Sequence, residues 1–253
     1  MQKLRIVVPA VFATGALLLT GCSSSESGTG APAGSGAASS PSASPSPSPT
    51  DGKSLVQDTT DALKAVDSFH IEGNIAEDGD NLELDITYGE GDIAQGKLDG
   101  GDGKTVELRK TEDGTVYANA SSEFYAQAAS TDSSGPDLSS IAGKWVVVGD
   151  DAPTALASLG ELLDGDALAS SLEPDSDDDE TYELSGPEDV DGTSSYIVTD
   201  KDGDTFAIAA EGDPLPVKIT NKSDDSGEIN FDGYGDDVSV DAPDDGEIVP
   251  IPS

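Results

Sequence analysis

Apolar and polar residues alternate with a period of two along much of the chain after residue 50. In residues 81–88, NLELDITY, every second residue is apolar, while Glu83 and Asp85 occupy positions between them. Shorter runs with the same period are residues 106–109, 116–120, 182–184, 206–208, 215–219, 229–231 and 238–240. This alternation predicts about nine to eleven antiparallel strands, each with one buried face and one face in water.

Asp-Gly pairs lie between several of these alternating runs. They are Asp78-Gly79, Asp102-Gly103, Asp113-Gly114 and Asp202-Gly203. An Asp-Gly pair in this setting is a strong hairpin signal, because both residues tolerate the left-handed backbone conformation of tight turns. The pairs therefore predict that neighbouring strands are joined as hairpins.

Helical periodicity is confined to a few short stretches. Residues 54–66 place Leu55 and Leu63 on one stripe, and Ser54 with Gln57 forms a capping-box pattern. Shorter helices are expected at residues 122–129, 154–163 and 166–172. The order of helix, strands, helical insert and further strands predicts an α+β fold. In this fold a large curved antiparallel sheet forms a half-barrel, and a few short helices pack on its concave face.

The first residues have the pattern of a lipoprotein signal peptide. Residues 1–21 contain Lys3 and Arg5, followed by an apolar stretch too short to span a bilayer as a helix. They end in Leu-Thr-Gly before Cys22, which resembles the bacterial lipobox, and Cys22 is the only cysteine. We therefore expect Cys22 to carry the acyl chains that anchor the protein to the extracytoplasmic face of the cell membrane. The alternative is a soluble secreted protein cleaved nearby.

Residues 22–50 are expected to form a tether, and residues 51–253 a single domain. The tether consists almost wholly of Ser, Gly, Ala, Thr and Pro, and it ends in alternating Ser and Pro. Such a composition cannot be buried, and its Pro-rich part favours polyproline II. At ~3.1 Å per residue, the tether could hold the domain up to about 80 Å from the membrane.

The net charge of −39 restricts the possible binding partners but does not indicate an unfolded chain. All charged residues except Lys3, Arg5 and Glu26 lie after residue 50. So acidic a domain repels phosphate, which excludes nucleic acid as a partner and disfavours contact with an anionic lipid surface. The acidic residues fall on turns and on alternate strand positions, so the charge does not indicate disorder.

The sequence contains no constellation that points to catalysis, a metal or a cofactor. His70 is the only histidine, and it follows Phe69 at a position expected on the opposite face of a strand. Zinc or thiol chemistry would need further ligands, and no G-x-S-x-G motif occurs. Residues 200–211 have acidic spacing similar to a calcium loop, but Thr205 stands where the required glycine would be. A hairpin turn is the better interpretation, and we expect a protein that is not an enzyme.

Several short stretches, together with the order of elements, resemble the LppX/LprAFG-type lipoproteins of actinobacteria, which belong to a wider LolA-like group. The matching stretches are residues 55–69, 191–198, 214–219 and 231–243. The resemblance implies an incomplete barrel of antiparallel strands around helices. It also implies an apolar cavity that carries acylated lipids or glycolipids across the cell envelope.

The leading hypothesis is therefore a monomeric, membrane-anchored lipoprotein that binds and transports an apolar lipid or glycolipid. The expected cavity lining is Leu82, Leu84, Ile86, Val106, Leu108, Trp145, Leu156, Leu159 and Leu163. For Trp145, the sole tryptophan, core packing is the alternative to lining the hollow. The alternative function is an envelope sensor or protein-interaction module with a filled core and no ligand. A hydrolase is a third hypothesis and would have to depend on His70.

Overall fold

The structure is a computed structural model that describes residues 49–77, 80–131, 137–149, 152–174, 181–222 and 227–252. These residues lie within one compact unit, residues 45–253. The expected signal peptide, Cys22 and all but the last residues of the expected tether lie outside the described residues.

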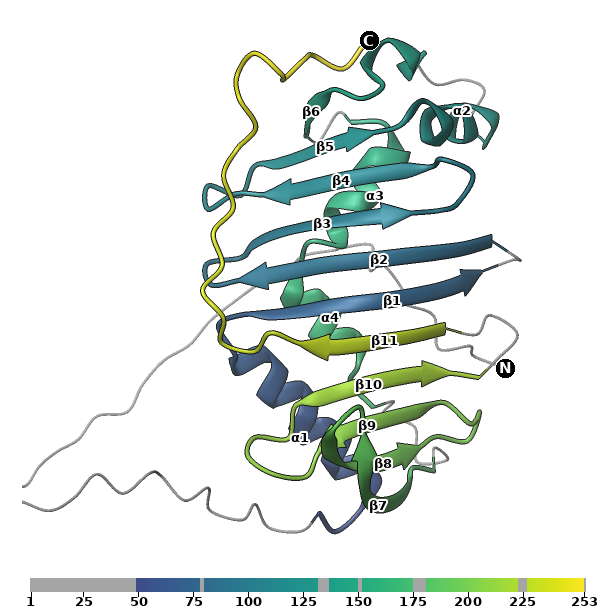
Figure 1. Ribbon diagram of the computed structural model, residues 1–253, viewed down its shortest axis with the longest axis vertical. Coiled ribbons are helices and arrows are strands. Elements are labelled where there is room, and N and C mark those ends of the chain that lie inside the picture. The colour runs from purple at the N-terminus through teal and green to yellow at the C-terminus, as the bar shows by residue number, and fades with distance from the viewer. Residues whose placement is uncertain are drawn as a thin grey trace, which may run out of the picture. The chain divides into compact units, whose positions relative to one another are not determined.

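Eleven antiparallel strands form one open, curved sheet, which confirms the predicted α+β class (Figure 1). The order across the sheet is β6-β5-β4-β3-β2-β1-β11-β10-β9-β8-β7. The first half contains β1 (Phe69–Glu77), β2 (Asp80–Gly89), β3 (Ile93–Asp99), β4 (Thr105–Lys110), β5 (Val116–Ala120) and β6 (Trp145–Val148). The second half contains β7 (Glu183–Val190), β8 (Thr193–Thr199), β9 (Thr205–Ala209), β10 (Pro216–Asn221) and β11 (Gly227–Asp232).

The two halves are joined where the first strand of the chain pairs with the last. Ile71 of β1 lies opposite Phe231 of β11 on one side and opposite Ile86 of β2 on the other. Each of these three side chains is at most 5% exposed. The apolar face that the alternation predicts therefore continues across the junction between the halves.

Asp-Gly turns join neighbouring strands as predicted. Asp102 has a φ of 52° and Gly103 a φ of 80°, between β3 and β4. Gly114 and Gly203 have positive φ in the hairpins that follow β4 and β8. The expected turn at residues 78–79 lies outside the described residues.

The described helices are short. They are α1 (Gly52–Ala65), α2 (Ser122–Thr131), α3 (Thr154–Glu161) and α4 (Gly165–Ser171), with a 3-10 helix, η1, at Leu138–Ile141. Helices α1, α3 and α4 lie against one face of the sheet, whereas α2 packs against η1 and β4 (Figure 1). The N-cap of α1 is Asp51, whose side chain accepts from the Ser54 amide at 2.9 Å. The helix thus begins two residues before the expected start, and the cap is Asp51, not Ser54 with Gln57.

Two parts of the sheet pattern differ from the prediction. Strand β3 was not expected, because its inward positions are Ala94, Gly96 and Leu98 and give only a weak apolar signal. Residues 238–240, expected as a strand, belong to an irregular C-terminal segment that follows β11. That segment runs along the ends of β1 to β5 and reaches β6 (Figure 1).

Candidate functional site

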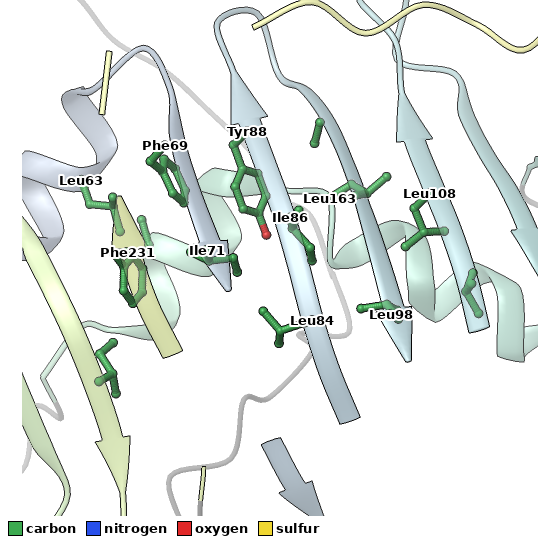
Figure 2. Close-up of a cluster of buried hydrophobic side chains, with 14 of the residues drawn as sticks. Leu63, Phe69, Ile71, Leu84, Ile86, Tyr88, Leu98, Leu108, Leu163 and Phe231 are labelled. Carbon is green, nitrogen blue, oxygen red and sulfur yellow. The ribbon is translucent and has the colours of Figure 1, made fainter. Parts of the chain in front are cut away.

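The concave face of the sheet and the helices that cover it form the candidate site. Six of the nine expected lining residues lie together in one buried apolar cluster, and they are Leu84, Ile86, Val106, Leu108, Leu156 and Leu163. Leu82 and Leu159 are half-buried and pack against this cluster. Figure 2 shows the strand side chains of the cluster projecting from neighbouring strands on the same face.

Helices α3 and α4 cover the face through a small number of side chains. Leu156 of α3 and Leu163, between the two helices, are both 0% exposed. Ala169 of α4 is 1% exposed. Helix α3 lies over β4 and β6, and α4 packs on α1. In this state the apolar face is occupied by the protein's own leucines and alanines.

Trp145 lies on the other face of the sheet, away from the helices that it was expected to face. On β6 it is opposite Asn119, whereas Val146 is opposite Ala118 in the core. The Arg109 guanidinium stacks over the Trp145 ring at 4.6 Å from its centroid. The C-terminal segment pairs with the same residue, because the Val249 amide donates to the Trp145 carbonyl at 2.8 Å. Trp145 is therefore buried by the C-terminal segment and Arg109, outside the expected lining.

A cavity of about 230 Å³ opens at one end of the helices. Its walls come from the end of α1, the start of β1, the turn between β2 and β3, and the start of α4. The rings of Phe69 and Tyr88 stack in its wall with centroids 4.6 Å apart. The Tyr88 hydroxyl donates to the Leu162 carbonyl at 2.7 Å, and burial raises the pKa of this hydroxyl. The cavity thus adjoins the junction of α3 and α4.

Sequence reasoning did not identify this cavity. Its apolar wall includes Leu63, Val66, Phe69, Tyr88 and Ile93, which come from α1 and its C-cap, β1, β2 and β3. Gly165 completes the wall, because a Cβ there would lie 3.2 Å from Cδ1 of Tyr88. Periodicity assigned Leu63, Val66, Phe69 and Tyr88 to buried faces but not Ile93, and it carried no information on which faces meet at the end of the sheet.

His70 lies on the face opposite Phe69 and Ile71, as the alternation predicts. Its Nδ1 is 2.8 Å from a carboxylate oxygen of Asp232, and its Nε2 is 3.0 Å from one of Asp85. His70 therefore links β2, β1 and β11 on the outer face, at the junction of the two halves of the sheet.

His70 gives the folded protein a defined pH dependence. Burial lowers the pKa of His70, but the hydrogen bonds to Asp232 and Asp85 raise it, and the net direction is upward. Protonated His70 therefore stabilises the folded state. This contribution to the free energy of unfolding is fully present below the pKa of about 6.5 that His70 has in the unfolded chain, and it is lost as the pH rises through the higher pKa of the folded state.

We expect the contribution of His70 to the free energy of unfolding to fall by less than about 1 kcal/mol between about pH 5.5 and pH 8. The change is small because His70 and its two partners, Asp85 and Asp232, are partly exposed. The difference between wild type and His70→Gln in urea unfolding at the two pH values measures this contribution. An identical pH dependence in both proteins would contradict the assignment.

The segment with calcium-like spacing forms a hairpin turn. One carboxylate oxygen of Asp200 accepts from the amides of Asp202 and Asp204, both at 2.9 Å, and Asp204 accepts from the Lys222 amide at 2.8 Å. The carboxylates of Asp200 and Asp204 therefore accept hydrogen bonds from backbone amides, in the turn between β8 and β9 and just after β10. Within the described residues, no group of three or more His, Cys, Asp or Glu is placed to hold a metal ion. The helices described here are also too short or too polar to cross a bilayer.

No family model matches the chain, and no curated protein matches it. Among solved structures, the chain is similar to LprF from Mycobacterium bovis, with 17% identity, a TM-score of 0.48, and coverage of 76% of this chain and 96% of that one. It is also similar to the lipoprotein LppX from Mycobacterium tuberculosis, with 16% identity, a TM-score of 0.43, and coverage of 74% and 97%. A LolA superfamily protein from Nitrosomonas europaea is similar at 10% identity, with a TM-score of 0.22 and coverage of 77% and 96%. LprF and LppX carry names of the LppX/LprAFG type that the sequence stretches resemble.

Proposed function

We propose that this chain is a membrane-anchored lipoprotein that binds an apolar lipid or glycolipid between the sheet and helices α3 and α4, without catalysis. The observation that carries the proposal is the continuous apolar face of the open sheet, which spans both halves. Helix α1, of 14 residues, covers part of it, and the remaining cover is α3 with 8 residues and α4 with 7. Apolar faces of this extent under a thin cover suit a ligand with long hydrocarbon chains.

Binding requires the helical cover to move. The cavity of about 230 Å³ is smaller than the ~300–1,000 Å³ typical of ligand sites, so it accommodates only part of a lipid. An acyl chain that displaces α3 and α4 would bury apolar surface against the same strand residues, at roughly 25 cal/mol per Å². Helix α3 has Pro153 at its N-cap position and no side-chain hydrogen bond to its first turn. The N-terminal end of α3 therefore lacks the stabilisation that a capping side chain provides.

The anchor and tether give this binding its location. In the proposal, acylated Cys22 holds the protein at the extracytoplasmic face of the membrane, and residues 22–50 separate the domain from it. The acidic domain is repelled by anionic headgroups. Lipid transfer between the domain and a membrane would then depend on the tether length.

Native mass spectrometry of the full-length protein, recovered from its own membrane, tests the proposal. We expect a solvent-extractable mass beyond that of the anchor. An amphiphile with a brominated acyl chain and an uncharged head should also quench a tryptophan placed on α3 by Leu159→Trp in a Trp145→Phe background. It should leave the natural Trp145 unquenched, because Trp145 lies on the outer face. Absence of both a bound lipid and quenching at position 159 would overturn the proposal.

The second candidate is a sensor or protein-interaction module. The filled interior favours it, because Ile86, Leu108 and Leu156 are all at most 1% exposed. This function predicts that a protein partner is recovered after crosslinking in intact membranes, and that no lipid accompanies the purified chain. The same mass measurement therefore separates the two functions.

A further inference from the structure

The cavity beside Phe69 and Tyr88 combines an apolar wall with an acidic rim. The rim residues are Lys64, Asp67, Glu90, Asp92 and Asp166. Apart from Lys64, all are carboxylates. Both the wall and the rim therefore bear on what the cavity can bind.

Ion pairs already account for two of the rim charges. Lys64 Nζ lies 2.6 Å from a carboxylate oxygen of Glu173, and Asp92 lies 2.5 Å from Lys110 Nζ. Asp67, Glu90 and Asp166 form no ion pair within the described part of the chain, and all three are exposed. The mouth of the cavity thus presents three carboxylates whose charge is not compensated locally.

We propose that this cavity is the mouth through which an acyl chain reaches the concave face, and that its rim selects a lipid with a cationic, amine-bearing head over one with an anionic head. This inference rests on the proposed function. The chain would enter past the Phe69 and Tyr88 rings toward the junction of α3 and α4, and it would have to move Gly165, which packs against both rings, away from them. The head would stay at the rim, where Asp67, Glu90 and Asp166 attract an ammonium group and repel a phosphate or carboxylate.

The charge of the whole domain cannot produce this selectivity to the same extent. Exposed charges more than about 10 Å apart are largely screened at 0.1 M salt. Asp67, Glu90 and Asp166 line one cavity, so a head held at its mouth would be nearer to these three carboxylates than to most of the charge of the domain. The interaction of each exposed carboxylate with a charged head contributes modestly. Together they should favour a cationic head over an anionic one by about tenfold or more.

The experiment compares amphiphiles that share one tail. The full chain carrying Cys22→Ser is titrated by calorimetry with dodecyltrimethylammonium, dodecyl maltoside and dodecanoate, each below its micelle concentration. We expect the cationic probe to bind most tightly and dodecanoate most weakly. Equal affinity for the cationic and anionic probes would overturn the inference while leaving the proposed function in place.

A matched pair of variants separates the rim from the net charge. The rim variant is Asp67→Asn, Glu90→Gln and Asp166→Asn. The control is Glu112→Gln, Glu211→Gln and Asp213→Asn, which removes the same charge from exposed turns away from the cavity. The ratio of cationic to anionic affinity should fall about tenfold in the rim variant and stay unchanged in the control. The same ratio in both variants would overturn the inference, whereas no binding of any probe to any form would overturn the proposed function itself.

Discussion

Replacement of Leu163 by alanine is expected to lower the free energy of unfolding by about 2–5 kcal/mol. Leu163 is 0% exposed and belongs to the buried cluster that α3, α4 and the strands share. Truncation removes its buried methyl groups and leaves a void, because the strands on one side cannot collapse onto a short helix on the other. Urea unfolding of the wild type and the variant measures the difference.

Leu159→Ala is the matched control for this change. Leu159 lies on the same helix cover but is only half-buried, so its loss should cost clearly less. An apolar amphiphile should restore part of the stability of Leu163→Ala, because a ligand that binds only the folded state stabilises it. A change below about 1 kcal/mol for Leu163→Ala would contradict the close packing of the helix cover.

The fold was predictable where burial on one face imposes alternation. In β2, Leu84, Ile86 and Tyr88 point inward while Glu83 and Asp85 face water, and Asp-Gly turns mark where several hairpins reverse. Strand β3 lacks this signal because close packing restricts one of its inward positions to glycine. A Cβ on Gly96 would lie 2.7 Å from Cγ1 of Ile86, so the neighbouring strand fills that space.

Residues 238–240 alternate between apolar and polar residues but pair with no strand. The strand that the alternation predicts there is therefore wrong. Gly233 and Gly235 have positive φ, and they turn the chain away from β11. Val238 then approaches Gly89 at the end of β2, where a Cβ on the glycine would lie 2.8 Å from the valine side chain. Such a contact depends on the three-dimensional course of the segment, which a period of two does not encode.

The position of Trp145 could not be derived from its own sequence neighbourhood. Residues 145–148 are all apolar, so the strand has no alternation that would mark an inner face. Only the pairing with β5 fixes it, since Val146 opposite Ala118 faces the core and Trp145 therefore faces outward. The candidate cavity has the same limitation at a larger scale, because Leu63, Tyr88 and Gly165 meet there from three elements that are distant in sequence.

Replacement of Cys22 by serine is expected to move the protein almost completely from the membrane fraction to the soluble fraction. The proposed anchor consists of acyl chains on Cys22, each stabilised by about 0.8 kcal/mol per buried methylene group. Serine cannot accept the thioether-linked lipid, so the variant loses this contribution entirely. The measurement is fractionation of cell envelopes, combined with the intact mass of the N-terminal fragment of the wild type.

The charge of the domain makes this test decisive. With a net charge of −39, the chain gains no attraction from anionic headgroups that could retain it once the acyl chains are lost. Residual binding of Cys22→Ser that persists in high salt, in protein whose mass shows that residues 1–21 have been removed, would therefore contradict an anchor at Cys22 and indicate another apolar contact with the membrane. A wild-type protein without acyl mass, found mainly in the medium, would instead support the secreted alternative.

Deletion of residues 31–50, which leaves Cys22 in place, should keep the protein in the membrane fraction, because the acyl chains and not the tether hold it there.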